Sequence, residues 1–213
     1  MRAMVIDSYG GPELFRAADI PTVRPGPGEV LIRTAYAAVN PADWKQREGM
    51  LGNFREFAFP LVLGFDAAGI IAEVGEGVTR FRPGDRVVTL SDQLWGGHGS
   101  YAEHVCVRAS RVQPLPRGLD FRAGATIPVG GATAYGAVVD MGRVRAGERV
   151  LVNGGAGSVG LFAIQLAKAA GATVAATCSA RNAELVRAYG ADHAIDYTRG
   201  NVLNVLQAWA PAG

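Results

Sequence analysis

The segment Arg149–Gly171 constrains the fold of this chain more than any other stretch. It opens with the apolar run Val150–Val152, and its apolar residues then recur with a helical period as far as Gly171. Between the predicted strand and helix, residues 155–160 read G-x-G-x-x-G, and a second apolar run follows at 173–177. Glycines in such a turn let the backbone approach a diphosphate, which the N–H groups of the helix N-terminus can bind.

This turn favours dinucleotide binding, although a glycine-rich turn can also do no more than connect a strand to a helix. The second predicted strand supports the first interpretation, because strand, turn, helix and strand together form a βαβ unit. The residues predicted to contact the diphosphate are Gly155, Ala156, Gly157, Ser158 and Val159.

The end of the second predicted strand indicates which dinucleotide would bind. NAD-binding units carry an acidic residue there for the ribose 2′-hydroxyl. This chain has Ser179 and Arg181 instead, and its first acid, Glu184, falls inside the next helical pattern. Because a hydroxyl and a guanidinium suit a 2′-phosphate, we expect NADP(H). The alternative is that Ser179 caps a helix over 181–189 and that Arg181 is a solvated first-turn residue.

Composition sets wider limits. The 213 residues allow two domains, and the net charge of +2 gives no reason to expect a nucleic acid or an acidic membrane as partner. Cys106 and Cys178 lack metal-ligand spacing, which favours a reducing compartment. The most apolar stretch, Thr126–Val139, is interrupted by Pro128 and is too short to cross a bilayer. We therefore expect a soluble, cytoplasmic protein without a secretory signal.

The pattern of elements changes near residue 118. Before it, short strands alternate with Pro and Gly turns, which is typical of a compact β domain. After it, strands and helices alternate as in a parallel α/β fold. The expected strands are 3–6, 29–39, 67–74, 86–90, 101–107, 150–152, 173–177 and 193–196, and the expected helices are 41–48, 121–125, 131–141, 158–170, 181–189 and 201–208.

These motifs, in this order, resemble the medium-chain dehydrogenase/reductase superfamily, and its zinc-independent quinone oxidoreductase branch fits best. The resemblance implies an α/β protein, with a GroES-like β domain over residues 1–118 and the N-terminal half of a Rossmann domain over 119–213. It is carried by the segments Val39–Lys45, Leu63–Gly69, Val74–Val78, Phe81–Val87, Gly99–Glu103 and Gly154–Gly160.

The same resemblance argues against a metal. Zinc-dependent members carry a Cys at the position of Asn40, a His at that of Phe65, and four Cys in the region 90–106, where this chain has only Cys106. The three histidines do not supply a tetrahedral set at their spacings. The implied reaction is NADPH-dependent hydride transfer to a quinone or an α,β-unsaturated carbonyl. The alternatives are an enoyl-thioester reductase and a non-catalytic NADPH-binding or interaction protein.

The resemblance also implies roles for individual residues. Asn40 would lie beside the nicotinamide or would only cap a helix, and Lys45 would donate to a developing oxyanion or would only be solvated. Thr133 would contact the nicotinamide side or only start a helix. Tyr197 would flank the adenosine phosphate or only pack at a strand end. Asn40 and Lys45 are thus the catalytic candidates, and Asn40, Thr133 and Tyr197 are added to the cofactor contacts.

Family members continue for about another hundred residues, by this resemblance, and that part completes the sheet and carries the strand used in dimerisation. The expected sheet edge and one sheet face therefore expose apolar side chains. This leaves open a homo-oligomer or a partner chain that completes the Rossmann domain, and leaves open whether this chain is active alone.

Overall fold

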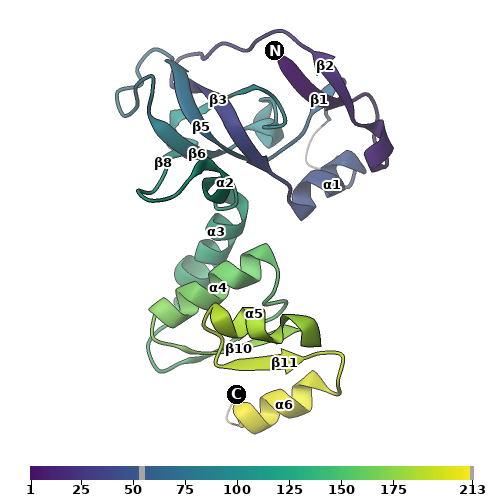
Figure 1. Ribbon diagram of the computed structural model, residues 1–213, viewed down its shortest axis with the longest axis vertical. Helices are drawn as coiled ribbons and strands as arrows, with labels where there is room; N and C mark the ends of the chain where they lie inside the picture. The colour runs from purple at the N-terminus through teal and green to yellow at the C-terminus, as the bar shows by residue number, and fades with distance from the viewer. Residues whose placement is uncertain (53–55, 212–213) are drawn as a thin grey trace. The chain divides into compact units, whose positions relative to one another are not determined.

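The computed structural model describes residues 1–52 and 56–211 and forms two compact units, Met1–Val129 and Gly130–Gly213 (Figure 1). The first unit runs beyond residue 118, where the sequence predicted a boundary. The reason is that helix α2 (Phe121–Gly124) belongs to its core, since Phe121 and Ala125 pack with Leu115. Gly124 allows this contact, because a Cβ there would lie 2.4 Å from a Leu115 methyl carbon.

The first unit is built on a five-stranded antiparallel sheet with the order β7-β3-β5-β6-β8. Its core consists of inward-facing apolar side chains that the alternation along the strands supplies. The strands are β3 (Glu29–Ala38), β5 (Asp66–Val74), β6 (Arg86–Leu90), β7 (His104–Arg108) and β8 (Val112–Pro114), and the core includes Val30, Ile32, Ala67, Ile71, Val87, Val105 and Val107.

The pairing of β3 with β5 is irregular, and this irregularity curls the sheet. The register shifts between Thr34 and Tyr36, opposite Gly69. A Cβ on Gly69 would lie 2.1 Å from the Arg33 carbonyl oxygen, so the two backbones are too close for any other residue. Bulges of this kind bend a strand and increase its twist.

A second sheet, with the order β2-β1-β4, lies in the same unit. Strand β1 (Arg2–Ile6) was predicted, whereas β2 (Arg16–Asp19) and the two-residue β4 (Leu61–Val62) were not. Strand β7 begins at His104, three residues later than the expected strand over 101–107, because Ala102 makes only an isolated bridge to Ala3. The predicted helix over 41–48 is confirmed as α1 (Pro41–Arg47).

The second unit is a parallel sheet with the order β11-β10-β9. Helices α4 and α5 cover one of its faces and α6 lies against the other (Figure 1). Its core centres on Ile164, Ala167, Val174, Ala176 and Val186. The alternation predicted from the sequence is confirmed by β9 (Arg149–Val152), α4 (Ser158–Ala169), β10 (Thr173–Cys178), α5 (Ala183–Ala188), β11 (His193–Asp196) and α6 (Val202–Trp209).

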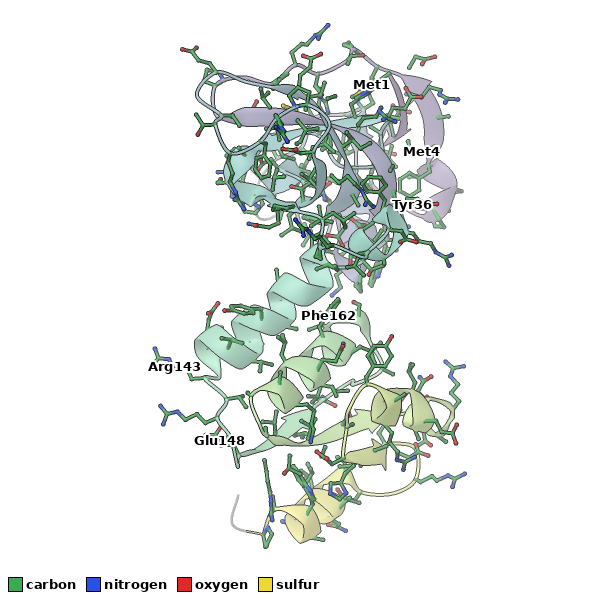
Figure 2. All side chains as sticks on the ribbon, turned by 60° about the vertical axis from the view of Figure 1, so that its left-hand side comes forward. Met1, Met4, Tyr36, Arg143, Glu148 and Phe162 are labelled. Atoms are coloured by element: carbon green, nitrogen blue, oxygen red, sulfur yellow. The ribbon has the colours of Figure 1, made fainter. Side chains whose placement is uncertain are left out.

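Helix α3 (Pro128–Tyr135) begins earlier than the expected start at 131 and continues as a π-helix over Gly136–Met141. Phe162 of α4, labelled in Figure 2, packs against α3. A Cβ on Gly130 would approach the Phe162 ring to 3.2 Å, so the glycine permits this close packing.

The expected exposure of apolar side chains around the parallel sheet is confirmed. Leu151 lies on edge strand β9 and is 41% exposed, and α6 buries none of its residues, with Leu203 65% exposed. Arg143 and Glu148, between the π-helix and β9, are exposed as well (Figure 2). Within the described residues, no helix has the length and apolar character needed to cross a membrane.

Candidate functional site

The glycine-rich turn lies where β9 meets α4, as the sequence predicted, and its glycines are required by close packing. A Cβ on Gly160 would lie 2.4 Å from the Gly154 carbonyl oxygen and 2.7 Å from the Gly155 Cα atom. A Cβ on Gly155 would lie 2.7 Å from the Ala176 Cβ atom of β10. The first turn of helix α4 therefore packs directly on the backbone of the glycine-rich turn. The free N–H groups at the start of α4 are then available to a ligand bound at that turn.

Thr177, near the end of β10, braces this turn and was not singled out from the sequence. Its hydroxyl accepts the Gly154 N–H at 2.8 Å and donates to the Asn153 side chain at 2.6 Å. Its carbonyl accepts the Gly155 N–H at 2.8 Å. A buried threonine at the carboxyl end of the middle strand was the available signal, because the turn of a βαβ unit folds over that end.

A cavity of about 380 Å³ opens beside the turn, within the range of cofactor pockets. It joins the turn, the end of β10 and the segment after β11. Its lining contains five of the predicted contacts together with four residues that were not predicted. The predicted ones are Ala156, Gly157, Ser179, Arg181 and Tyr197, and the others are Gly154, Thr177, Cys178 and Asn182.

Three of the five predicted diphosphate contacts do not line this cavity. Gly155 is buried beneath the turn against Ala176. Val159 packs against the core of the second unit, and Ser158 is exposed as the first residue of α4. Their role as cofactor contacts stays a prediction that would depend on their backbone N–H groups.

The rim of the cavity agrees with the helix cap proposed as the alternative in position but not in side-chain hydrogen bonding. Ser179 precedes a short 3₁₀ helix, Ala180–Asn182, and its side chain accepts no capping bond from that helix backbone. Its hydroxyl instead accepts from the Asn182 side-chain amide at 3.3 Å. Ser179 therefore occupies the N-cap position that the alternative gave it, but its side chain makes no capping bond. Arg181 is exposed and lines the cavity.

Asp196 orders the segment that carries Tyr197 of the rim. It ends β11 directly opposite Cys178 of β10. Its carboxylate accepts the Thr198 hydroxyl at 2.7 Å and the Thr198 N–H at 2.9 Å. The Thr198 hydroxyl, then its N–H, hold the pKa of Asp196 below its ordinary value. The Tyr197 N–H donates to the Cys178 carbonyl at 3.2 Å, and this bond links the segments that carry Ser179 and Tyr197.

In the first unit, Asp43 organises the start of α1. It is 2% exposed, and its carboxylate accepts the Asn40 N–H at 2.6 Å, the Phe65 N–H at 3.0 Å and the Tyr101 hydroxyl at 3.0 Å. Burial raises the pKa of Asp43, and these hydrogen bonds oppose that shift. Asp43 is thus a structural acid that fixes Asn40 at the helix N-terminus.

Asn40 occupies the N-cap position of α1 and is 5% exposed. Its side-chain Nδ2 donates to Asp66 at 2.9 Å, a partner that the sequence did not indicate. Lys45 is exposed, with its Nζ 5.7 Å from the centroid of the Trp44 ring. Thr133 is exposed in the second turn of α3, so the alternative that it starts a helix is wrong. The functional roles of Asn40, Lys45 and Thr133 stay predictions.

Two family models match this chain. One is described as "Alcohol dehydrogenase GroES-like domain" and matches residues 26–117, and the other is described as "Zinc-binding dehydrogenase" and matches residues 158–213. A chloroplast envelope quinone oxidoreductase homolog of Arabidopsis thaliana is 36% identical over 203 residues, which are 92% of this chain and 61% of that protein.

Solved structures are also similar to this chain. A crystal structure described as an NAD-dependent alcohol dehydrogenase is 36% identical with a TM-score of 0.88, and the match covers 99% of this chain and 68% of that one. The Escherichia coli quinone oxidoreductase complexed with NADPH is 28% identical with a TM-score of 0.87, over 99% of this chain and 63% of that one.

The chain belongs to the zinc-independent quinone oxidoreductase branch of the medium-chain dehydrogenase/reductase superfamily. It spans about three fifths of the length of the curated relative from Arabidopsis thaliana. The description of the second family model mentions zinc, but this chain has other side chains at the two ligand positions that the resemblance implies. Asn40 is an amide bonded to a carboxylate and Phe65 is a buried ring, and neither is a zinc ligand.

Proposed function

We propose that the protein binds NADP(H) in the cavity of the second unit and that the whole protein transfers hydride to a quinone or an α,β-unsaturated carbonyl. The observation that carries this proposal is the composition of the cavity. It combines the backbone of the glycine-rich turn with Ser179 and Arg181 at the rim, and among the described residues that line it there is no carboxylate. A pyrophosphate and a 2′-phosphate both fit that set of donors.

The residues present fit the cofactor. Gly157 leaves the floor of the cavity without a side chain, and Tyr197 is 57% exposed at its edge, available to lie against the adenosine part. When bound, NADPH supplies the hydride. The part of this chain would be to bind and orient it, because no metal is required to polarise an acceptor that is already electron-poor. Asn40 would orient the ring or the acceptor, and Lys45 would donate to the developing oxyanion.

The Arabidopsis relative and the Escherichia coli structure support the choice of cofactor and acceptor through their names. The deciding experiment mixes the purified chain with NADPH and follows absorbance at the nicotinamide band with a benzoquinone, an enone or an enoyl thioester. Oxidation with quinone or enone supports the proposal. Oxidation with the thioester alone would identify an enoyl-thioester reductase. Binding without oxidation of any acceptor, both by this chain and by a version extended to the length of its relatives, would identify a non-catalytic NADPH-binding protein.

Arg181→Ala is expected to weaken NADPH binding about 10- to 100-fold and to leave NADH binding within about twofold. The reason is that a guanidinium–phosphate bond is worth about 1.5–3 kcal/mol and that NADH has no 2′-phosphate. Fluorescence titration with both cofactors measures this. Arg145→Ala removes an exposed arginine that does not line the cavity and is the matched control. Equal weakening for NADH and NADPH would contradict the assignment of the rim.

Two further proposals concern the surroundings of the protein. A reducing compartment such as the cytoplasm is supported by the thiols, since Cys106 and Cys178 are both free and burial raises the pKa of Cys106 to about 12. Self-association or a partner at the parallel sheet is supported by exposed Leu151 on the edge strand, because an edge strand readily pairs with another chain.

A further inference from the structure

Asp66 is the first residue of β5, it is fully buried, and it takes no part in the reaction proposed above. Its two carboxylate oxygens accept hydrogen bonds from residues of two different elements. One oxygen accepts the Nδ2 of Asn40, at the start of α1, at 2.9 Å. The other accepts the backbone N–H of Val129, in the first turn of α3, at 2.9 Å. Asp66 therefore links a side chain at one helix start to the backbone of another.

The chemistry of these groups makes the arrangement directional. An ionised carboxylate only accepts hydrogen bonds, so Asn40 must turn its NH₂ group towards Asp66 and its Oδ1 away from it. The Val129 N–H belongs to the backbone of a helix and cannot turn. Of the two donors to Asp66, Asn40 alone can reverse its direction, by rotating its side-chain amide.

We propose that Asp66 is a positioning residue, whose carboxylate fixes the direction of the Asn40 amide and ties it to the first turn of α3. This inference rests on the proposed function in one respect, which is the role of Asn40 beside the nicotinamide. Helix α3 also carries Thr133, four residues after Val129 and so on the same helical face. Asp66 thus acts on the start of the element that bears a second predicted cofactor contact.

The surroundings of Asp66 make this positioning sensitive to pH. Burial, with a further contribution from the nearby Asp43 charge, raises the pKa of Asp66 to about 6. The other titratable group near it is Tyr101, whose pKa is raised by burial and by the charges of Asp43 and Asp66, so its hydroxyl stays protonated. Protonation of Asp66 below about pH 6 adds an O–H donor to a carboxyl group that already faces two donors, the Asn40 amide and the Val129 N–H. The Asn40 amide then reverses, so that its Oδ1 accepts the new O–H.

The isosteric variant Asp66→Asn mimics that state at every pH. Its amide oxygen must face the fixed Val129 N–H, so its NH₂ group faces Asn40. Two NH₂ groups cannot bond each other. Asn40 is therefore expected to reverse its amide, so that its Oδ1 accepts a hydrogen bond from the new NH₂ group of the Asp66→Asn variant. The fold is expected to remain intact, because the variant has the same shape and the bonds to Asn40 and to the Val129 N–H are both kept once Asn40 has turned.

The test observes Asn40 directly in the full chain. In ¹H–¹⁵N spectra, the side-chain NH₂ signal of Asn40, assigned through its loss in Asn40→Ser, is expected to titrate with a midpoint near pH 6 in the unmodified chain. In Asp66→Asn the signal is expected to be shifted and independent of pH. The exposed control, Asp19→Asn, is expected to leave the titration unchanged. A signal that does not titrate in the unmodified chain, or that still titrates in Asp66→Asn, would overturn the proposal.

A kinetic arm separates this inference from the proposed function. Where NADPH oxidation is measurable, kcat/KM is expected to fall as pH drops through about 6 in the unmodified chain. In Asp66→Asn it is expected to be lower by up to about 100-fold and flat over the same range. A pH profile in Asp66→Asn that matches the unmodified chain would overturn the positioning role. If no acceptor is reduced by any variant, or by a version extended to the length of its relatives, while the Asn40 signal behaves as expected, the proposed function fails and the assignment of Asp66 stands.

Discussion

Gly157→Ala is expected to weaken NADPH binding about 100-fold without lowering the thermal unfolding midpoint of the chain. Gly157 has ordinary backbone angles, with φ at −78°, and the nearest atom to an added Cβ is the Gly154 carbonyl oxygen at 3.4 Å. The chain itself therefore tolerates alanine. Because Gly157 lines the cavity, the added methyl group would occupy space that the diphosphate needs, and would displace it from one or two charge-assisted hydrogen bonds.

Fluorescence titration with NADPH and a thermal melt of the same samples measure both parts of this prediction. Gly136→Ala is the matched control, because an added Cβ at Gly136 has no atom within 4 Å and Gly136 does not line the cavity. Unchanged NADPH affinity in Gly157→Ala would contradict a diphosphate at this turn. Loss of affinity together with a lower unfolding midpoint would mean that the substitution acts on the fold instead.

Gly160→Ala should differ from Gly157→Ala in its stability. We expect it to lower the unfolding midpoint as well as to weaken NADPH binding. Its Cβ would lie 2.4 Å from the Gly154 carbonyl oxygen and 2.8 Å from the Gly155 carbonyl carbon, and both atoms belong to backbone that cannot rotate away. Such overpacking costs about 1–3 kcal/mol. In a unit of this size, that lowers the unfolding midpoint by about 4 °C or more.

Calorimetry of the unmodified chain and of both glycine variants tests this contrast. Only the transition of the second unit should move in Gly160→Ala, because Gly160 and its close neighbours all belong to that unit. A melt of Gly160→Ala that matches that of Gly157→Ala would contradict the close packing of α4 on the turn.

The fold of the second unit was the most predictable part of the chain. Its helices and strands alternate in the sequence, and local turn residues such as Gly171 mark their ends. In the first unit, β2 and β4 were missed because they are short and owe their structure to pairing with β1 on either side. Such pairing connects distant parts of the chain and leaves little local pattern.

The candidate site divides in the same way. The glycine-rich turn and the rim residues Ser179 and Arg181 follow from local spacing, and they line one cavity. Asp66 was not singled out, because its importance comes from hydrogen bonds to segments that only the fold brings near. The sequence has no signature that distinguishes an acidic residue that makes such hydrogen bonds from one whose side chain is solvated.

The central claim is that the turn at the start of α4 holds the pyrophosphate and that the rim beside it holds a 2′-phosphate. The most direct measurement is a map of backbone amide shifts in ¹H–¹⁵N spectra of the chain during titration with NADPH and with NADH. We expect the largest shifts for both cofactors over residues 155–160, with additional shifts at Ser179 and Arg181 for NADPH alone. Shifts concentrated away from the glycine-rich turn, or identical shifts at the rim for both cofactors, would contradict the claim.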